Sequence, residues 1–476
     1  MSGRAVLDFG FLAALVACLT PVANMDVYFH LSAARWMHAH GAVPTADFLS
    51  WTHRGRPWVD FEWATQLLYA VLARCGGMTA LWAFKAAAFA ALLLAFAALL
   101  RLWRLPDAWI GLALPPFILS FGQLLDARPE IASYAFCLLE LYALEARRMG
   151  KLKLGLAPLA ALHAAAYAAW ANLHAGYPLG LALCLLYAAG EAVDGRGVRD
   201  WLIVGAAALA GSFATPYGLT IVGVFADHWR RMDVLRAYAL QWRPPALGDP
   251  YARMYWLLFF SSSGALLACA ATSRRLPYAH WFVVLAVSAL AARSLRHTAY
   301  YALLCFPLAL RALSLLEPPR WWKDARAYAL AFGVVAVAAS GRQTLGRQHL
   351  FERLDQTSRR VPAGACAYLK TNAPRLAGLK LYNSWNLGGY LGYALYPGYA
   401  VFADGRYVFD DELPQIARAL SSPESWKAFV IEKDIGLVVQ ENTGAAIDLA
   451  YMPPADWDRA YEDERAVVWV RRGAAR

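Results

Sequence analysis

The sequence predicts a polytopic α-helical membrane protein that ends in a small soluble α/β domain. Two observations lead to this fold class: the 476-residue chain is 59% hydrophobic with a mean hydropathy of +0.37, and its apolar segments stop near residue 340. A soluble protein of this length does not need so much apolar surface. We therefore expect a transmembrane domain over residues 1–340 and a soluble α/β domain over residues 341–476.

The apolar segments of the first domain predict about eleven membrane spans. A helix needs about 20 residues to cross a hydrocarbon core of about 30 Å, so the shorter segments must extend into the interface. The first segment leads to Asp26 without a small-x-small cleavage site, and we interpret it as a retained span. The predicted spans are Val6–Ala23, Met78–Leu102, Ala108–Phe121, Ile131–Glu145, Leu154–Ala171, Tyr177–Val193, Trp201–Ala214, Met254–Ala271, Tyr278–Ala292, Tyr300–Leu316 and Tyr328–Ser340.

The segment Asp60–Cys75 decides which loops share a side of the membrane. It is apolar but short and carries charges near its ends, so it can either span the membrane or lie along its surface. As an amphipathic surface helix it puts most loop cations on one side, which the positive-inside rule identifies as cytoplasmic. These cations also explain the net charge of +11 without nucleic acid as a partner. They are Arg4, Arg101, Arg104, Arg147, Arg148, Lys151, Lys153, Arg196, Arg199, Arg274, Arg275, Arg320, Lys323 and Arg326.

This orientation places the N-terminus in the cytoplasm and the C-terminal domain on the opposite, extracytoplasmic side. From Gly341 onward, β-type runs alternate with helix-like segments, and about 130 residues of this kind suffice for a small α/β domain. Only one of the seven cysteines, Cys366, lies in this tail, so a disulfide within it is not expected. The β-type runs are 378–382, 399–402, 435–439 and 466–470, and the helix-like segments are 412–420 and 423–432.

Two carboxylates stand out on the predicted outer side. Asp26 follows the first span, where a lipid-borne substrate meets water, although solvation alone also explains one interfacial acid. Glu130 follows Pro129 at the start of another span, and a helix N-terminus favours both residue types. Together, Asp26 and Glu130 can hold an acceptor hydroxyl, remove its proton or share a divalent metal.

A dense basic cluster also lies on this outer side, which the charge rule predicts to be poor in arginine. It consists of Arg293, Arg296 and His297. Guanidinium groups bind phosphate through paired hydrogen bonds, so the cluster suits the phosphate of a polyprenyl lipid. Contact with anionic lipid in the outer leaflet is the alternative.

Other polar residues of the outer loops have a structural and a functional interpretation. Asn172 fits a tight turn. Turn chemistry explains His174 less well, so contact with substrate stays open as a second interpretation of this residue. In the tail, Asp404-Gly405 is a frequent turn pair. The adjacent Arg406 can contact an acceptor or the membrane domain.

Taken in order, short blocks of the chain resemble the bacterial GT-C superfamily of integral membrane glycosyltransferases, in a subgroup with a C-terminal periplasmic domain. The resemblance covers most of the chain. The blocks are Asn24-x-Asp26 with Phe29-His30-Leu31, Pro44-x-x-Asp47-x-x-Ser50, Arg56-Pro57-Trp58, Glu62-Trp63, Arg128-Pro129-Glu130, Trp170-Ala171-Asn172-Leu173-His174, Pro216-Tyr217-Gly218 and Asp404-Gly405-Arg406.

The resemblance implies a polyprenyl-phosphate-linked sugar donor and a lipid, glycan or protein acceptor at the outer face of a bacterial inner membrane. It implies that Asp26 is the catalytic centre, with Glu130 as a second acid. Members with an Asp-Asp or Asp-Glu pair have another acid after the first, which Asp26 lacks, so a divalent metal stays open and no other cofactor is expected. The residues expected to contact the substrates or membrane lipids are His30, Glu62, Arg128, Asn172, His174, Tyr217, Arg293, Arg296, His297, Asp404 and Arg406.

Two other functions remain as alternatives. A lipid or glycolipid flippase would use the basic cluster as an entry gate, but it predicts internal pseudo-symmetry and paired charges near the midplane, and the sequence shows neither. A non-catalytic membrane scaffold would bind a partner enzyme through the tail. The sequence therefore favours the glycosyltransferase.

Overall fold

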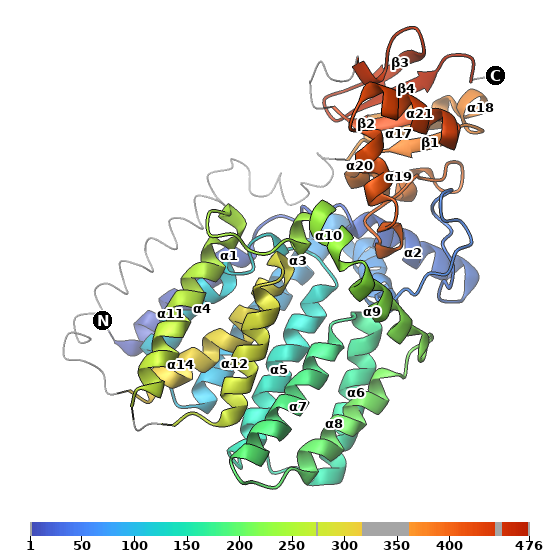
Figure 1. The fold of residues 1–476 in the computed structure, drawn as a ribbon. Coiled ribbons are helices and arrows are strands. Elements are labelled where there is room, and N and C mark those ends of the chain that lie inside the picture. Colours follow the sequence, from blue (N-terminus) through green and yellow to red (C-terminus); the bar gives the residue numbers. More distant parts are fainter. Residues whose placement is uncertain (1, 273–274, 317–360, 443–449, 475–476) are drawn as a thin grey trace. The chain divides into compact units, whose positions relative to one another are not determined.

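The computed structural model describes residues 2–272, 275–316, 361–442 and 450–474, which form two compact units (Figure 1). Unit 1 comprises Met1–Val22, Cys75–Leu219 and Ala239–Leu354, and unit 2 comprises Ala23–Arg74, Thr220–Tyr238 and Asp355–Arg476. Unit 2 thus combines the first long loop with the C-terminal residues. The predicted domain boundary at 340/341 and the predicted span Tyr328–Ser340 lie outside the described residues.

Unit 1 is built from α-helices, because its apolar runs are long and rich in Ala and Leu. α1 packs against α4, α6 packs against α8, and α7 contacts α5, α8 and α12. Helices occupy each predicted span that lies within the described residues. Besides part of α3, the α-helices described in unit 1 are α1 (Gly3–Cys18), α4 (Asp107–Leu119), α5 (Glu130–Arg148), α6 (Leu156–Leu173), α7 (Tyr177–Val193), α8 (Arg199–Ser212), α11 (Arg253–Ala270), α12 (Tyr278–Ala291), α13 (Thr298–Tyr300) and α14 (Phe306–Ser314), the last two joined by a π-helical turn (Tyr301–Cys305).

α3 (Trp63–Leu102) consists of two helical stretches that are separated at Gly76 and Gly77. Gly77 has a φ of +60°, and a positive φ is sterically disfavoured for residues that carry a side chain. The break separates the predicted surface helix Asp60–Cys75 from the predicted span that begins at Met78. The sequence therefore predicted the position of this break correctly.

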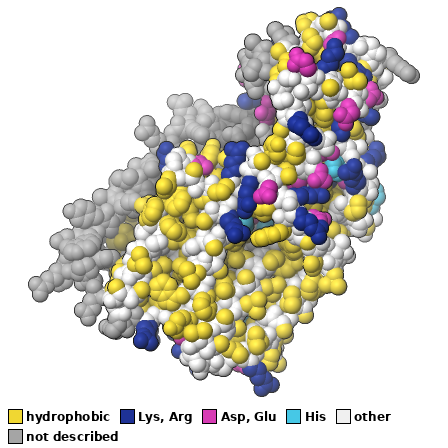
Figure 2. Space-filling view, in the orientation of Figure 1, with side chains coloured by type: hydrophobic (Ala, Val, Ile, Leu, Met, Phe, Trp, Pro, Cys, Tyr) yellow, Lys and Arg dark blue, Asp and Glu magenta, His cyan; other side chains and the backbone are white. Residues whose placement is uncertain are grey.

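Among the described residues, α3 is the one helix that is both long and apolar enough to cross a membrane. α4, α7 and α12 are apolar but shorter, with 13, 17 and 14 residues. Large apolar side chains nevertheless cover much of the visible surface of the unit 1 helices (Figure 2). Leucines that are at least half exposed occur on several of these helices: Leu94, Leu139, Leu162, Leu185, Leu202, Leu257, Leu267 and Leu285.

Unit 2 contains a four-stranded mixed sheet in the order β1-β2-β4-β3. β1 (Lys380–Asn383) pairs with β2 (Ile435–Glu441) in parallel, and β4 (Ala466–Arg471) pairs antiparallel with both β2 and β3 (Trp457–Glu462). Successive residues of β2 and β4 point into two different apolar clusters, so the central strands are buried on both faces.

Short helices cover both faces of this sheet and complete unit 2. α17 and α19 contribute to one apolar cluster, and α21 contributes to the other. The prediction for 399–402 as a strand was wrong, because Val401 forms only an isolated bridge with Ser50, and the polar strand β3 was missed. The helices of unit 2 other than the start of α3 are α2 (Val27–His40), α9 (Thr220–Arg230), α10 (Met232–Tyr238), α17 (Ala363–Thr371), α18 (Ala373–Leu376), α19 (Gly388–Leu395), α20 (Leu413–Ala419) and α21 (Pro423–Lys433).

Candidate functional site

Each unit carries a polar cluster that contains residues expected from the sequence to act on substrate. In unit 2 the central residue is Asp26, which is half-buried immediately before α2. Its carboxylate lies against the backbone of Gly405 in the C-terminal part of the unit. The side chain of Asn24 accepts a hydrogen bond from the Asp26 N–H at 3.2 Å, which forms a local turn just before the helix.

His30 and Glu62 also lie together in unit 2, as part of a chain of buried polar side chains. His30 Nδ1 is 3.8 Å from a Glu62 carboxylate oxygen and 3.4 Å from Gln66 Nε2. Gln66 Nε2 in turn donates to Asp60 at 2.7 Å. The structure therefore brings together two expected residues, His30 and Glu62, and adds Asp60 and Gln66, which sequence reasoning did not select as site residues.

Burial raises the pKa of the Asp60 carboxyl to about 7, although the Glu62 N–H, Arg406 and Gln66 partly oppose the shift. An aspartate in an unfolded chain titrates near pH 4, so the folded state binds this proton more tightly and loses stability as the pH rises from about 4 through about 7. We expect Asp60→Asn to remove that loss. The midpoint of thermal unfolding in detergent, measured from pH 5 to pH 8, should fall less steeply for the variant.

Asp410 provides an internal reference for this measurement. Burial also raises the pKa of its carboxyl to about 7, and Asp410 is present in both proteins. Its contribution to the pH dependence therefore cancels when the two curves are subtracted. Parallel curves for the wild type and Asp60→Asn would contradict the assignment of this titration to Asp60.

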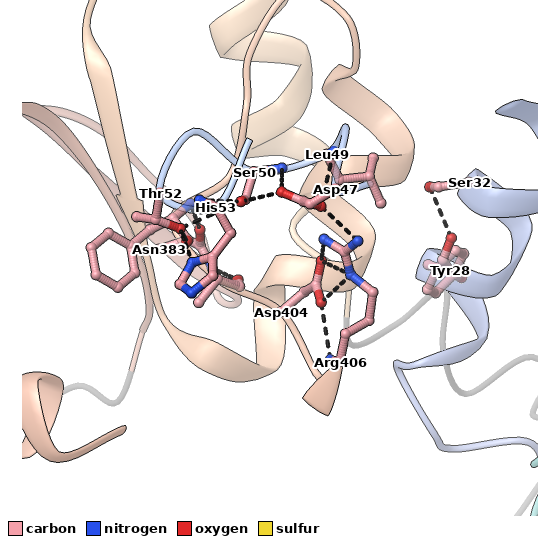
Figure 3. Close-up of polar contacts among 12 residues, drawn as sticks. Tyr28, Ser32, Asp47, Leu49, Ser50, Thr52, His53, Asn383, Asp404 and Arg406 are labelled. Atoms are coloured by element: carbon pink, nitrogen blue, oxygen red, sulfur yellow. Dashed lines mark hydrogen bonds and ion pairs between the residues drawn. The ribbon is translucent and has the colours of Figure 1, made fainter. Parts of the chain in front are cut away.

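Arg406 joins the first loop to the C-terminal residues of unit 2 (Figure 3). Its guanidinium donates to both oxygens of Asp404 at 2.8 Å and lies 2.7 Å from Asp47. Asp47 also accepts a hydrogen bond from the Ser50 N–H at 3.1 Å. Arg406 is 3% exposed and packs its guanidinium 4.6 Å from the centre of the Trp58 ring. Asp404 and Arg406, both expected to contact substrate, are thus members of a buried ion-pair network.

We expect Arg406→Ala to lower the free energy of unfolding by about 3 kcal/mol, because it leaves two buried carboxylates without their cation. Urea titration of the purified protein in detergent, followed by tryptophan fluorescence, measures this loss. The matched control is Arg459→Ala, which removes a surface ion pair with Glu462 and is expected to cost about 0–1 kcal/mol. Equal losses in the two variants would show that the Arg406 network contributes no more than a surface pair.

In unit 1, Glu130 pairs with cations at the start of α5. Its carboxylate contacts the guanidinium of Arg296 and lies 3.9 Å from that of Arg128. Arg128 also donates to Gln241 at 3.3 Å, and the Arg296 guanidinium lies 5.4 Å from the centre of the Trp242 ring. Since Glu130 is only 4% exposed, its charge is neutralised mainly by these arginines.

His174 belongs to the same cluster and is neutral. Burial lowers the pKa of its imidazole to about 4, against the opposing effect of Glu130. The Gly176 N–H donates to His174 Nδ1 at 3.1 Å, and Nδ1 lies 2.7 Å from Ser133 Oγ. Nδ1 is therefore an acceptor, so the proton of the neutral ring is on Nε2.

The remaining expected residues of unit 1 lie near the same helix ends. Asn172 donates to the carbonyls of Ala168 and Ala214, which ties the end of α6 to the segment after α8. Tyr217 is half-buried in that segment. His297 lies edge-on to Trp242 with ring centroids 5.7 Å apart, whereas Arg293 is exposed after α12.

The polar residues described above fall into two groups, one in each unit. The Asp26 site consists of Asp26, whose backbone carbonyl accepts from the His30 N–H at 3.3 Å, and of the linked side chains of His30, Asp60, Glu62 and Gln66 in unit 2. The Arg296 cluster consists of Arg128, Glu130, His174, Arg296 and His297 in unit 1. Within the described residues, no three His, Cys, Asp or Glu side chains are grouped as metal ligands would be.

Comparison with known proteins identifies the fold. No family model matches the chain, and no curated protein matches it in sequence. The Archaeoglobus fulgidus oligosaccharyltransferase AglB, solved with an inhibitory peptide and a dolichol-phosphate, is 12% identical with a TM-score of 0.55, over 92% of this chain and 69% of AglB. ArnT from Cupriavidus metallidurans bound to undecaprenyl phosphate is 14% identical with a TM-score of 0.52, over 99% of this chain and 98% of ArnT.

The arabinofuranosyltransferase AftD from Mycobacteria is a third similar structure. It is 16% identical with a TM-score of 0.54, over 99% of this chain and 42% of AftD. AglB, ArnT and AftD are GT-C glycosyltransferases. The chain therefore has the GT-C fold, as its resemblance in sequence predicted.

Proposed function

We propose that this chain is a GT-C glycosyltransferase that transfers a sugar from polyprenyl phosphate to a lipid, glycan or protein acceptor. The observation that carries the proposal is the half-buried carboxylate of Asp26 at the start of α2, in a chain with this fold. The similar structures of AglB and ArnT contain dolichol-phosphate and undecaprenyl phosphate, which supports a donor of the same class.

We place the reaction at the extracytoplasmic face of a bacterial inner membrane, with the N-terminus in the cytoplasm. The exposed leucines of the unit 1 helices support contact with lipid. Glu130 contacts Arg296, and Asn172 donates to the Ala214 carbonyl. These contacts join loops that are predicted to lie on the outer side, at one end of the unit 1 helices. At the opposite end, Glu145 accepts hydrogen bonds from Trp103 and Arg148 and lies 2.9 Å from His280, which gathers the predicted inner residues.

In the proposed mechanism, Asp26 accepts the proton of the acceptor hydroxyl as its oxygen attacks the anomeric carbon of the donor. A carboxylate in this position acts as a general base. The bond between the anomeric carbon and the phosphate oxygen breaks on the opposite side. The transfer therefore inverts the anomeric configuration and releases polyprenyl phosphate.

The Arg296 cluster stabilises the charge of the departing phosphate in this mechanism. Arg296 and Arg128 supply guanidinium donors, and His174 supplies a neutral ring with its proton on Nε2. We assign Glu130 a positioning role, because its contact with both arginines fixes their orientation. This role differs from the shared acid–base work that the sequence predicted for Asp26 and Glu130.

Reconstitution in liposomes tests the proposed function. The purified protein is supplied with polyprenyl phosphate carrying a labelled sugar on the protein's extracytoplasmic side, together with a membrane extract as the source of acceptor. Transfer of label from the lipid to another molecule, with release of polyprenyl phosphate, is expected. Anomeric analysis of the product by NMR measures the inversion.

The same experiment separates the two alternatives. A flippase moves the labelled donor across the bilayer and leaves its sugar–phosphate bond intact. A scaffold does neither, and in cells its function would be lost on deletion of the tail but kept on replacement of Asp26. Either result would overturn the proposed transferase.

A further inference from the structure

Gly405 lies where the C-terminal part of unit 2 meets the Asp26 carboxylate. A Cβ atom built on Gly405 would lie 3.0 Å from Asp26 Cγ and closer still to its Oδ1. The backbone of the turn Asp404–Gly405–Arg406 therefore forms one wall around this carboxylate. Gly405 does not have a positive φ, so the close approach to Asp26, and not backbone strain, is the reason for a glycine here.

The turn that forms this wall is held rigidly. Asp404 accepts hydrogen bonds from the Arg406 N–H at 3.0 Å and from its guanidinium at 2.8 Å. Asn383 fixes the preceding segment, because its amide donates to the Ala403 carbonyl and accepts from the Phe402 N–H, both at 2.8 Å. Figure 3 shows Asp47 approaching the same guanidinium from the first loop. A turn with these bonds cannot move aside at low cost.

A second glycine, Gly389, allows the start of α2 to pack closely against α19 in the C-terminal part of unit 2. A Cβ atom built on Gly389 in α19 would lie 3.0 Å from the Met25 carbonyl oxygen and 3.6 Å from the Phe29 nitrogen. Next to it, the rings of Tyr28 and Tyr390 pack edge to face with centroids 4.8 Å apart. The backbone around Asp26 is therefore fixed by α19, while its carboxylate is fixed by the turn.

We propose that the Asp404–Gly405–Arg406 turn is a positioning element for the Asp26 carboxylate. This inference rests on the proposed function, in which Asp26 is the general base. A base held by rigid neighbours stays close to its productive geometry, and a misplacement of about 1 Å is enough to cost about 10²-fold in rate. Asp404 and Arg406 act through Asp26 and do not bind substrate themselves.

Gly405→Ala tests this role, because the added methyl group displaces the carboxylate of Asp26 without removing any bond of the turn. We expect kcat for sugar transfer to fall about 10- to 100-fold, while the KM for the donor and the midpoint of thermal unfolding stay unchanged. Gly378→Ala is the matched control. Gly378 has no atom within 4 Å of its built Cβ and no positive φ, so wild-type kcat is expected.

Two further variants keep the proposal distinguishable from a purely structural role. Arg406→Lys keeps the buried charge but loses the bidentate fork, so kcat per folded molecule should fall with the donor KM unchanged. In the double variant Asp26→Asn/Gly405→Ala, the alanine should cause no further loss. A lower thermal midpoint in Arg406→Lys with wild-type kcat per folded molecule would overturn the positioning role.

The outcomes also separate this inference from the proposed function. If Asp26→Asn retains full transfer, the proposed function fails and the inference fails with it. If Asp26→Asn is inactive while Gly405→Ala has wild-type kcat, only the inference fails. A decrease in kcat for Gly405→Ala that persists unchanged in the Asp26→Asn background would also overturn it, because the glycine would then act independently of Asp26.

Discussion

Replacing Asp26 with Asn is expected to reduce kcat for sugar transfer by roughly 10³- to 10⁴-fold. The amide keeps the size of the side chain but cannot accept a proton from the acceptor hydroxyl. Because Asp26 is half-buried and its carboxylate lies against Gly405, the isosteric change leaves the packing intact. Transfer from a labelled polyprenyl-phosphate sugar in proteoliposomes measures the loss, and size-exclusion chromatography checks that the variant is folded.

The matched control for this experiment is Asp233→Asn. Asp233 lies in α10, also in unit 2, with a side chain that is 96% exposed and a surface contact with Arg236. The same loss of one carboxylate charge should leave transfer at the wild-type rate. If Asp26→Asn transferred sugar as fast as Asp233→Asn, Asp26 would not be the base and the proposed mechanism would fail.

The helical part of the fold could be predicted from the sequence because it depends on local pattern. Apolar runs such as 177–193 became α7 with the same bounds, and the break at Gly76 and Gly77 follows from residues that helices disfavour. The composition of unit 2 was not predicted. It depends on contacts between segments far apart in the chain, such as the bridge from Ser50 to Val401.

The contacts among the candidate site residues could not be predicted from the sequence, because they also join segments that are far apart in the chain. Sequence reasoning identified Glu130 and Arg296 separately, but their ion pair joins residues 166 positions apart and carries no local signal. An arginine beside an Asp-Gly turn is expected from the sequence to be exposed. In the structure Arg406 is buried and paired with Asp47 and Asp404. The spacing Asp47-x-x-Ser50 was the available signal, because an aspartate that accepts from the N–H three residues later is typical of a fixed turn.

Replacing Arg296 with Ala is expected to lower kcat about 10²- to 10³-fold, because the departing phosphate loses a guanidinium donor. The same substitution also leaves the buried Glu130 carboxylate without its contacting cation, which destabilises unit 1. The double variant Arg296→Ala/Glu130→Gln removes both charges. We expect it to recover the thermal midpoint of the wild type while transfer remains at the level of Arg296→Ala.

Measuring stability and transfer separately distinguishes two roles of Arg296, neutralising Glu130 and stabilising the departing phosphate. Arg253→Ala is the control for removal of a cation from unit 1, since Arg253 is exposed at the start of α11, and it should transfer sugar normally. If the double variant regained both stability and transfer, Arg296 would serve only to neutralise Glu130, and the phosphate would need another partner. If it regained stability alone, and Glu130→Gln by itself transferred sugar faster than the double variant, the Arg296 guanidinium must act on the reaction, because the charge balance of the buried pair has been restored without it.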